Sequence, residues 1–172
     1  MDRWIPSEEE TFAQIGCLLL LTQQAEYVTS NLIGIVYPNN VPSWEELEEL
    51  NRQTLGTLVR TLQKRVDIHP GFEGLLNHFV KGRNLFIHRL SAQPYFDMHS
   101  EAGRDEIWNF LERYQKVLQE ILMVVTSTVF KHAETSGMAE TKWHDELRRR
   151  GFLQEIKEYD LRSQVAFRRR KP

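Results

Sequence analysis

Apolar residues recur at helical spacing along most of the chain, and short breaks divide this pattern into segments. The first segment opens with Ser7 and Glu10, whose spacing is that of a capping box, and runs to about Tyr37. Prolines and asparagines within 38–42 then end it. The side of this helix that we expect to face a core carries Phe12, Ile15, Leu19, Thr22, Ala25, Leu32 and Val36.

Two further helices are predicted in the middle of the chain. Ser43 and Glu46 repeat the capping box and open a second helix. Its apolar side carries Trp44, Leu47, Leu50, Leu55, Leu58, Leu62 and Val66. A turn at 67–71 follows, and Pro70 suits the first position of a third helix over residues 70–92.

The last part of the chain predicts two more helices. After a polar loop containing Gly103, a fourth long helix covers about 104–134. Its apolar stripe consists of Ile107, Leu111, Tyr114, Leu118, Ile121, Val125 and Val129. A shorter fifth helix leads into a basic C-terminal end, and strand-type alternation is absent. The pattern predicts an all-α, up-and-down bundle of four to five helices in one domain, with its core in 1–137 and a C-terminal helix and basic tail in 138–172.

The composition fits one soluble globular domain of 172 residues, with 41% apolar and 27% charged residues. The net charge of −2 hides an uneven distribution, because acidic residues dominate the first third and basic residues dominate 142–172. The basic end either attracts a polyanion or is a solvated terminus.

The single cysteine, Cys17, precludes an internal disulfide, and its leucine neighbours predict a buried thiol. The longest apolar run, 17–21, is too short for a membrane span, so we expect a cytoplasmic protein without a membrane partner.

The candidate catalytic and binding residues lie on the third helix. Arg83 falls at the centre of its apolar stripe, where an arginine is rare unless it is paired or faces a groove. A second line on the same helix is polar and consists of Asn77, Lys81, Asn84 and His88. Donors on two adjoining faces of one helix are suited to hold a phosphate.

The run from Arg83 to His88, with Asn84 as its second residue, resembles the signature of the HEPN superfamily. That signature is an arginine, a polar residue that is often Asn, three more residues and a histidine within a helical bundle. Chance alone supplies such an Arg-Asn-x-x-x-His run about 0.02 times in a chain of this composition. The resemblance covers this motif and the helical architecture. It implies a metal-independent endoribonuclease, as in toxins of toxin–antitoxin pairs, abortive-infection proteins and CRISPR effectors.

The chemistry that the resemblance implies needs no cofactor and no metal. The ribose 2′-hydroxyl attacks the adjacent phosphorus of RNA, and His88 acts as general acid or base. Arg83 stabilises the phosphoryl oxygens, and Asn84 orients the phosphate or the imidazole. Asn77 and Lys81 are the candidate substrate-binding residues.

The resemblance also implies partners besides the RNA substrate. In the family, two copies form a homodimer in which two motifs meet in one composite cleft, which we expect here through the third helices. An antitoxin or a defence complex is a further expected partner. The tyrosine that many toxins paired with nucleotidyltransferases carry two residues after the histidine is Leu90 in this chain.

Simpler interpretations of the same residues stay open. Arg83 could be a packing residue paired with Glu48, Glu49 or Glu106, and His88 a surface histidine. The chain would then be a catalytically inactive helical module that binds RNA, a nucleotide or a partner protein. Gly82 either lets a partner backbone approach closely or is merely tolerated within the helix.

Overall fold

Helices make up most of the part of the chain that the computed structural model describes, namely residues 4–35, 45, 49, 52–135 and 167–169. In chain order the elements are α1 (Glu8–Ile35), α3 (Leu55–Arg65), β1 (Val66–Ile68), α4 (Pro70–His88), the 3₁₀ turn η1 (Leu90–Ala92), α5 (Glu101–Thr135) and β2 (Phe167–Arg169). The structure is therefore mostly helical, as predicted. The expected fifth helix and basic tail, 138–172, lie outside the described residues except for 167–169.

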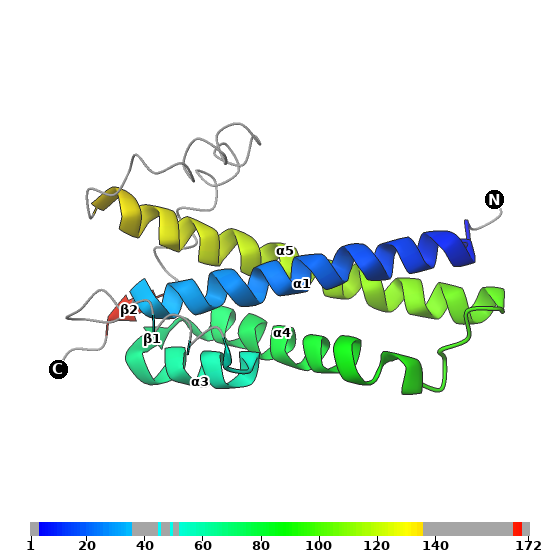
Figure 1. The fold of residues 1–172 in the computed structure, drawn as a ribbon, viewed down its shortest axis with the longest axis horizontal. Helices are drawn as coiled ribbons and strands as arrows, with labels where there is room; N and C mark the ends of the chain where they lie inside the picture. Colours follow the sequence, from blue (N-terminus) through cyan, green and yellow to red (C-terminus); the bar gives the residue numbers. More distant parts are fainter. Residues whose placement is uncertain (1–3, 36–44, 46–48, 50–51, 136–166, 170–172) are drawn as a thin grey trace.

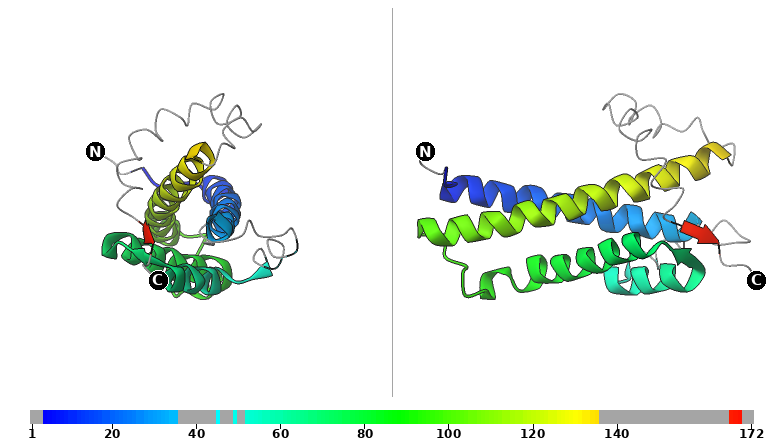
Figure 2. Two further views of the ribbon diagram at one scale, coloured as in Figure 1. Left: turned by 90° about the vertical axis from the view of Figure 1, so that its left-hand side faces the viewer. Right: turned by 180° about the vertical axis from the view of Figure 1, so that it is seen from behind.

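The long helices lie side by side along one direction (Figure 1). α1 and α5 run parallel and pack most extensively on each other, while α4 runs antiparallel to both and packs on α5 (Figures 1 and 2). α3 contacts α1 and α4 near the start of α4. The side chains that are fully buried between these helices are Leu18, Leu32, Ile33, Leu58, Leu62, Leu76, Phe79, Ile107, Leu111, Leu118, Ile121 and Val125.

Local sequence explains where the helices begin. Ser7 and Glu10 form the predicted capping box: the Ser7 N–H donates to Glu10 Oε2 at 2.7 Å, and the Glu10 N–H donates to Ser7 Oγ at 3.1 Å. The hydrogen bond from the Ser7 backbone N–H, and after it the Ser7 side chain, hold the pKa of the Glu10 carboxyl below its usual value. Pro70 occupies the first turn of α4 as predicted, because its fixed φ suits that position and it has no N–H to satisfy.

The predicted core face of α1 is partly wrong. Thr22, Ala25 and Leu32 are buried, but Phe12 is 53% exposed and Leu19 is 40% exposed. Cys17 is also exposed, which contradicts the predicted buried thiol. The reason is that α1 is uncharged for most of its length, so its apolar periodicity fits more than one face. The buried residues of α1 are Thr11, Leu18, Thr22, Ala25, Thr29, Ser30, Leu32 and Ile33.

The predicted second helix is interrupted, and the predicted third helix is shorter than expected. Glu45, Glu49 and Arg52 are helical, but Gln53 and Thr54 are not. The predicted core residues Trp44, Leu47 and Leu50 lie outside the described residues. α3 starts at Leu55, because Thr54 adopts an extended backbone and caps the helix through its hydroxyl. Val66 belongs to β1 and not to the helix. α4 ends at His88, after which Arg89 leaves helical geometry and η1 continues the chain to Ala92.

Strand pairing was missed in the sequence. β1 and β2 pair antiparallel, with Val66 opposite Arg169, Asp67 opposite Arg168 and Ile68 opposite Phe167. Strands of three residues are too short to show alternation, and nearly one hundred residues separate these two. The start of the basic C-terminal run is therefore part of the fold.

Gly103, which we expect in the polar loop, lies in the first turn of α5, because that helix begins at Glu101. A Cβ at Gly103 would collide with the backbone oxygen of Asp97, so only glycine fits where the chain turns into α5.

Candidate functional site

Arg83 lies where α4 passes α1, and its partner comes from α1. Its Nε donates to Oε1 of Glu26 at 2.7 Å, and the two side chains are only 20% and 27% exposed. The prediction that Arg83 lies on the inner side of its helix is consistent with this position. Of the two explanations considered for an inward arginine, ion pairing is present, and the carboxylate is Glu26. Glu26 is not one of the predicted partners, of which Glu48 lies outside the described residues.

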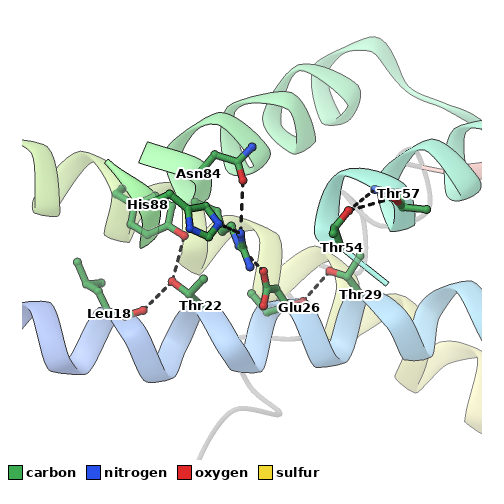
Figure 3. Close-up of polar contacts among 11 residues, drawn as sticks. Leu18, Thr22, Glu26, Thr29, Thr54, Thr57, Asn84 and His88 are labelled. Atoms are coloured by element: carbon green, nitrogen blue, oxygen red, sulfur yellow. Dashed lines mark hydrogen bonds and ion pairs between the residues drawn. The ribbon is translucent and has the colours of Figure 1, made fainter. Parts of the chain in front are cut away.

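The three residues of the motif gather around the same guanidinium. Arg83 Nη1 lies 2.8 Å from Nε2 of His88 and 3.5 Å from Oδ1 of Asn84 (Figure 3). Because Nη1 can only donate, Nε2 of His88 acts as the acceptor, which places the imidazole proton on Nδ1. Both Asn84 and His88 are exposed, so the cluster of Glu26, Arg83, Asn84 and His88 opens to solvent on the side of the motif.

The two edges of the Arg83 guanidinium have different surroundings. Glu26 occupies the Nε edge of Arg83 on the α1 side, whereas Nη1 points towards Asn84 and His88 on the solvent side. A carboxylate on one edge fixes the direction of the guanidinium fork. The outward edge is then oriented to meet an anion.

His88 owes its position to the end of α4. It is the last residue of the helix, and the N–H of Arg89 still bonds the carbonyl of Leu85 before the chain turns away. An imidazole at a helix terminus is exposed on more sides than one within the helix. Its Nε2 lies 2.8 Å from Nη1 of Arg83, five residues earlier.

Asn77 and Lys81 are exposed and lie further towards the start of α4. With a rise of about 1.5 Å per residue, Asn77 is roughly 10 Å along the helix from Asn84. They extend the polar line away from the cluster and do not join it. His78 is about 15 Å along the axis from His88, so the two histidines belong to different places.

A shallow groove of about 250 Å³ follows α4 on its α5 side. Its basic and imidazole groups are those of Lys81, His78 and Arg113. Its floor is apolar and is formed by Gly82, Leu85, Phe110, Tyr114 and Val117. None of the lining residues is acidic.

Tyr114 anchors the layer beneath the cluster. Its hydroxyl is 3.0 Å from that of Thr22, which itself donates to the carbonyl of Leu18, so Tyr114 is the donor to Thr22. Burial raises the pKa of Tyr114 to about 12. Its ring lies against Gly82, where a Cβ would come within 2.8 Å of Cδ2. Gly82 therefore makes room for a side chain of α5, and not for the backbone of a partner.

Glu26 is the member of the site that sequence reasoning missed. It is 57 residues before Arg83, and no spacing rule connects positions on different helices. A signal was nevertheless present, because Glu26 is the only charged residue between Glu10 and Glu45. A lone carboxylate within a long uncharged helix points to a cation on a neighbouring element.

Comparisons with protein-family models, with curated proteins and with solved structures found no match. Within the described ranges, no three His, Cys, Asp or Glu side chains gather in a way that could hold a metal ion. No helix in that part of the chain combines the length and the apolar character needed to cross a bilayer.

Proposed function

We propose that the protein is a metal-independent endoribonuclease of the HEPN type, and that its site is the cluster of Glu26, Arg83, Asn84 and His88. The observation that carries the proposal is the contact of 2.8 Å between Arg83 Nη1 and His88 Nε2, with Asn84 beside it at the exposed end of α4. A fixed cation next to an imidazole is the pair that phosphodiester transesterification requires.

The reaction assigns one task to each residue. A phosphate oxygen of RNA draws Nη1 of Arg83 away from His88, which frees Nε2 to take the proton of the 2′-hydroxyl. The 2′-oxygen bonds to phosphorus as the bond to the 5′-oxygen breaks, and the leaving oxygen takes a proton from a water molecule or a second acid. Arg83 balances the charge on the phosphoryl oxygens, and Asn84 orients the phosphate. The products carry a 2′,3′-cyclic phosphate and a 5′-hydroxyl.

The groove along α4 is the proposed path of the RNA strand beyond the site. Lys81 and Arg113 can meet the backbone phosphates, and the apolar floor suits an unstacked base. Asn77, which is exposed on the same helix, continues the polar line. A single strand fits this path better than a duplex, because in-line attack needs a pliable backbone.

The test is cleavage of an RNA pool by the purified full chain in the presence of EDTA, with analysis of the product ends. Arg83→Ala and His88→Ala are each expected to abolish cleavage and to leave the helical content unchanged. Arg83→Lys is expected to lose most activity, because a point charge cannot replace the planar fork. His99→Ala removes an exposed histidine that contacts Glu8 and no residue of the site, and it is the matched control. Strict dependence on magnesium, or full cleavage by His88→Ala, would contradict the proposal.

The biological setting proposed is that of a toxin or antiviral defence protein, restrained by an antitoxin or another partner. Expression in a bacterial host is then expected to slow growth, and His88→Ala to relieve the defect. A growth defect that persists in the His88→Ala variant would mean that RNA cleavage does not cause it.

The proposal includes a homodimer. Its sites are either composite, with residues from both copies, or self-contained within one copy, and mixing two inactive variants distinguishes these arrangements. In the composite cleft that the family resemblance implies, mixing the Arg83→Ala and His88→Ala variants restores some activity. The contacts within one chain favour a self-contained site, for which mixing restores none.

One observation favours a second candidate function, a non-catalytic binding module. Arg83 already has an anionic partner in Glu26, as structural arginines do. A protein that binds RNA or a nucleotide but cleaves no RNA in any pool would establish this alternative.

A further inference from the structure

Two tryptophans form an exposed aromatic pair at the end of the bundle where α1 and α5 begin (Figure 1). Trp4, in the segment that leads into α1, meets Trp108 of α5 with ring centroids 5.2 Å apart and ring planes at 77°. Trp4 is 57% exposed. In such a T-shaped pair the edge of one ring touches the face of the other, so two indole faces meet at a corner. Exposed tryptophans of this kind are the side chains that interfaces use most as anchors.

The corner is held in place by hydrogen bonds on both sides. Arg104 of α5 donates from Nε to the carbonyl oxygen of Pro6 at 2.9 Å and from Nη1 to that of Met98 at 2.9 Å. Pro6 is buried, so the segment that carries Trp4 is tied to α5. Trp108 Nε1 donates to Glu112 Oε1 at 3.2 Å, which orients the second ring. A ligand would therefore meet a preformed surface and would lose little affinity to ordering it.

Carboxylates surround the second ring. Glu101, Asp105, Trp108 and Glu112 follow one another at spacings of four, three and four residues, so they share one face of α5. We call this face together with Trp4 the tryptophan corner. The ranges 4–12 and 101–112 contain seven acidic residues and one basic residue, a net charge of −6, whereas the whole chain has −2. The one basic residue is Arg104, whose guanidinium already serves two backbone carbonyls.

The rings and the charge together select a cationic ligand. The face of an indole attracts a cation, and nearby carboxylates strengthen that attraction. RNA and an anionic membrane surface would be repelled, and a second copy of this chain would bring the same negative charge to the contact. An uncharged apolar partner would take the carboxylates out of water without supplying a cation.

We propose that the tryptophan corner is a docking surface for a basic segment of a partner protein, with an arginine side chain stacked on the indoles. Arginine suits the corner better than lysine, because its planar guanidinium stacks on an aromatic face while its N–H groups reach a carboxylate. The proposal does not depend on ribonuclease activity. It uses none of the residues Glu26, Arg83, Asn84 and His88.

The first experiment measures binding of a dye-labelled peptide of alternating arginine and glycine to the full chain by fluorescence anisotropy. Trp4→Leu keeps an apolar side chain but loses the ring, and it is expected to raise the Kd about 3- to 30-fold. Glu112→Gln is expected to raise the Kd about 2- to 5-fold, and the wild-type affinity to fall as salt is added. Circular dichroism checks that the variants keep their helices.

Two matched controls separate this site from general attraction to an acidic protein. Tyr27→Leu removes an exposed aromatic side chain from another part of α1. Glu120→Gln removes an exposed carboxylate of α5 that lies about 90° away from the face of Trp108. Both are expected to leave the Kd unchanged. If Glu120→Gln weakens binding as much as Glu112→Gln, the attraction is diffuse and the proposal is overturned.

The second experiment locates the peptide by NMR of the indole N–H groups, of which the chain has four. The peptide is expected to shift the signals of Trp4 and Trp108, assigned from Trp4→Leu and Trp108→Leu, and to leave the other two in place. Absence of binding, or binding that Trp4→Leu does not weaken, overturns the proposal. Spermine that binds as tightly as the peptide would also overturn it, because the surface would then take a small polyamine. None of these measurements uses RNA, so their failure is separate from failure of the proposed activity.

Discussion

Gly82 offers the sharpest test of how α4 is positioned, because alanine there must displace the ring of Tyr114. An added Cβ would lie 2.8 Å from Cδ2 and 3.0 Å from Cε2 of that ring. The ring has little freedom to move. Its hydroxyl is bonded to Thr22, and its centroid lies 5.2 Å from that of Phe86 and 6.0 Å from that of Phe110.

The expected magnitude follows from a comparison within the same helix. Alanine in place of glycine within a helix is favoured by about 1 kcal/mol. At Gly74 an added Cβ meets nothing within 4 Å, so Gly74→Ala is expected to gain most of that free energy. At Gly82 the same gain is opposed by overpacking, which costs about 1–3 kcal/mol. Gly82→Ala is therefore expected to be about 1–3 kcal/mol less stable than Gly74→Ala.

The assay is urea unfolding of the two variants and the wild type, followed by far-UV circular dichroism. Midpoints are expected in the order Gly74→Ala, wild type, Gly82→Ala, with similar slopes. In thermal unfolding, a difference of 2 kcal/mol corresponds to about 4–8 °C between the variants. If Gly82→Ala is as stable as Gly74→Ala, the ring does not restrict this position, and the account of α4 packing on α5 is wrong.

Two further predictions concern the Glu26–Arg83 ion pair and the buried hydroxyl of Tyr114. Glu26→Gln and Arg83→Gln, combined in a double-mutant cycle of urea unfolding, are expected to give a coupling free energy of about 1–2 kcal/mol, because the pair is neither fully exposed nor fully buried; a coupling near zero would contradict the pairing. Burial raises the pKa of Tyr114 from 10.0 to about 12, so between these pH values the unfolded chain has lost the hydroxyl proton and the folded chain has kept it. The free energy of unfolding therefore falls as the pH rises through this range. Tyr114→Phe is expected to remove this part of the alkaline loss of stability in melts recorded across that range, and an unchanged slope would refute the assignment.

Much of the local structure could be predicted from neighbouring residues alone. The capping box of Ser7 and Glu10, the start of α4 at Pro70 and the buried stripe of α5 depend on contacts a few residues apart. The buried stripe of α5 is identifiable because charged residues mark its outer side. The inward position of Arg83 follows from the same periodicity.

The α1 helix shows where periodicity stops being informative. With one charged residue between Glu10 and Glu45, apolar and small residues surround the helix, and the sequence alone cannot decide which face is buried. Periodicity assigns Phe12 and Leu19 to the core, but the structure buries Thr11 and Leu18 instead. The choice depends on the complementary surface of α5.

By itself the sequence determined most of α1, α3, α4 and α5, where several of them begin, and that Arg83, Asn84 and His88 share one helix. Only the tertiary structure decided that Glu26 pairs with Arg83, that Gly82 accommodates Tyr114, and that β1 pairs with β2. The physical reason is the range of the interactions. Helix propensity, caps and periodicity act within a few residues, whereas an ion pair or a ring contact joins elements whose relative placement depends on the packing of the whole core.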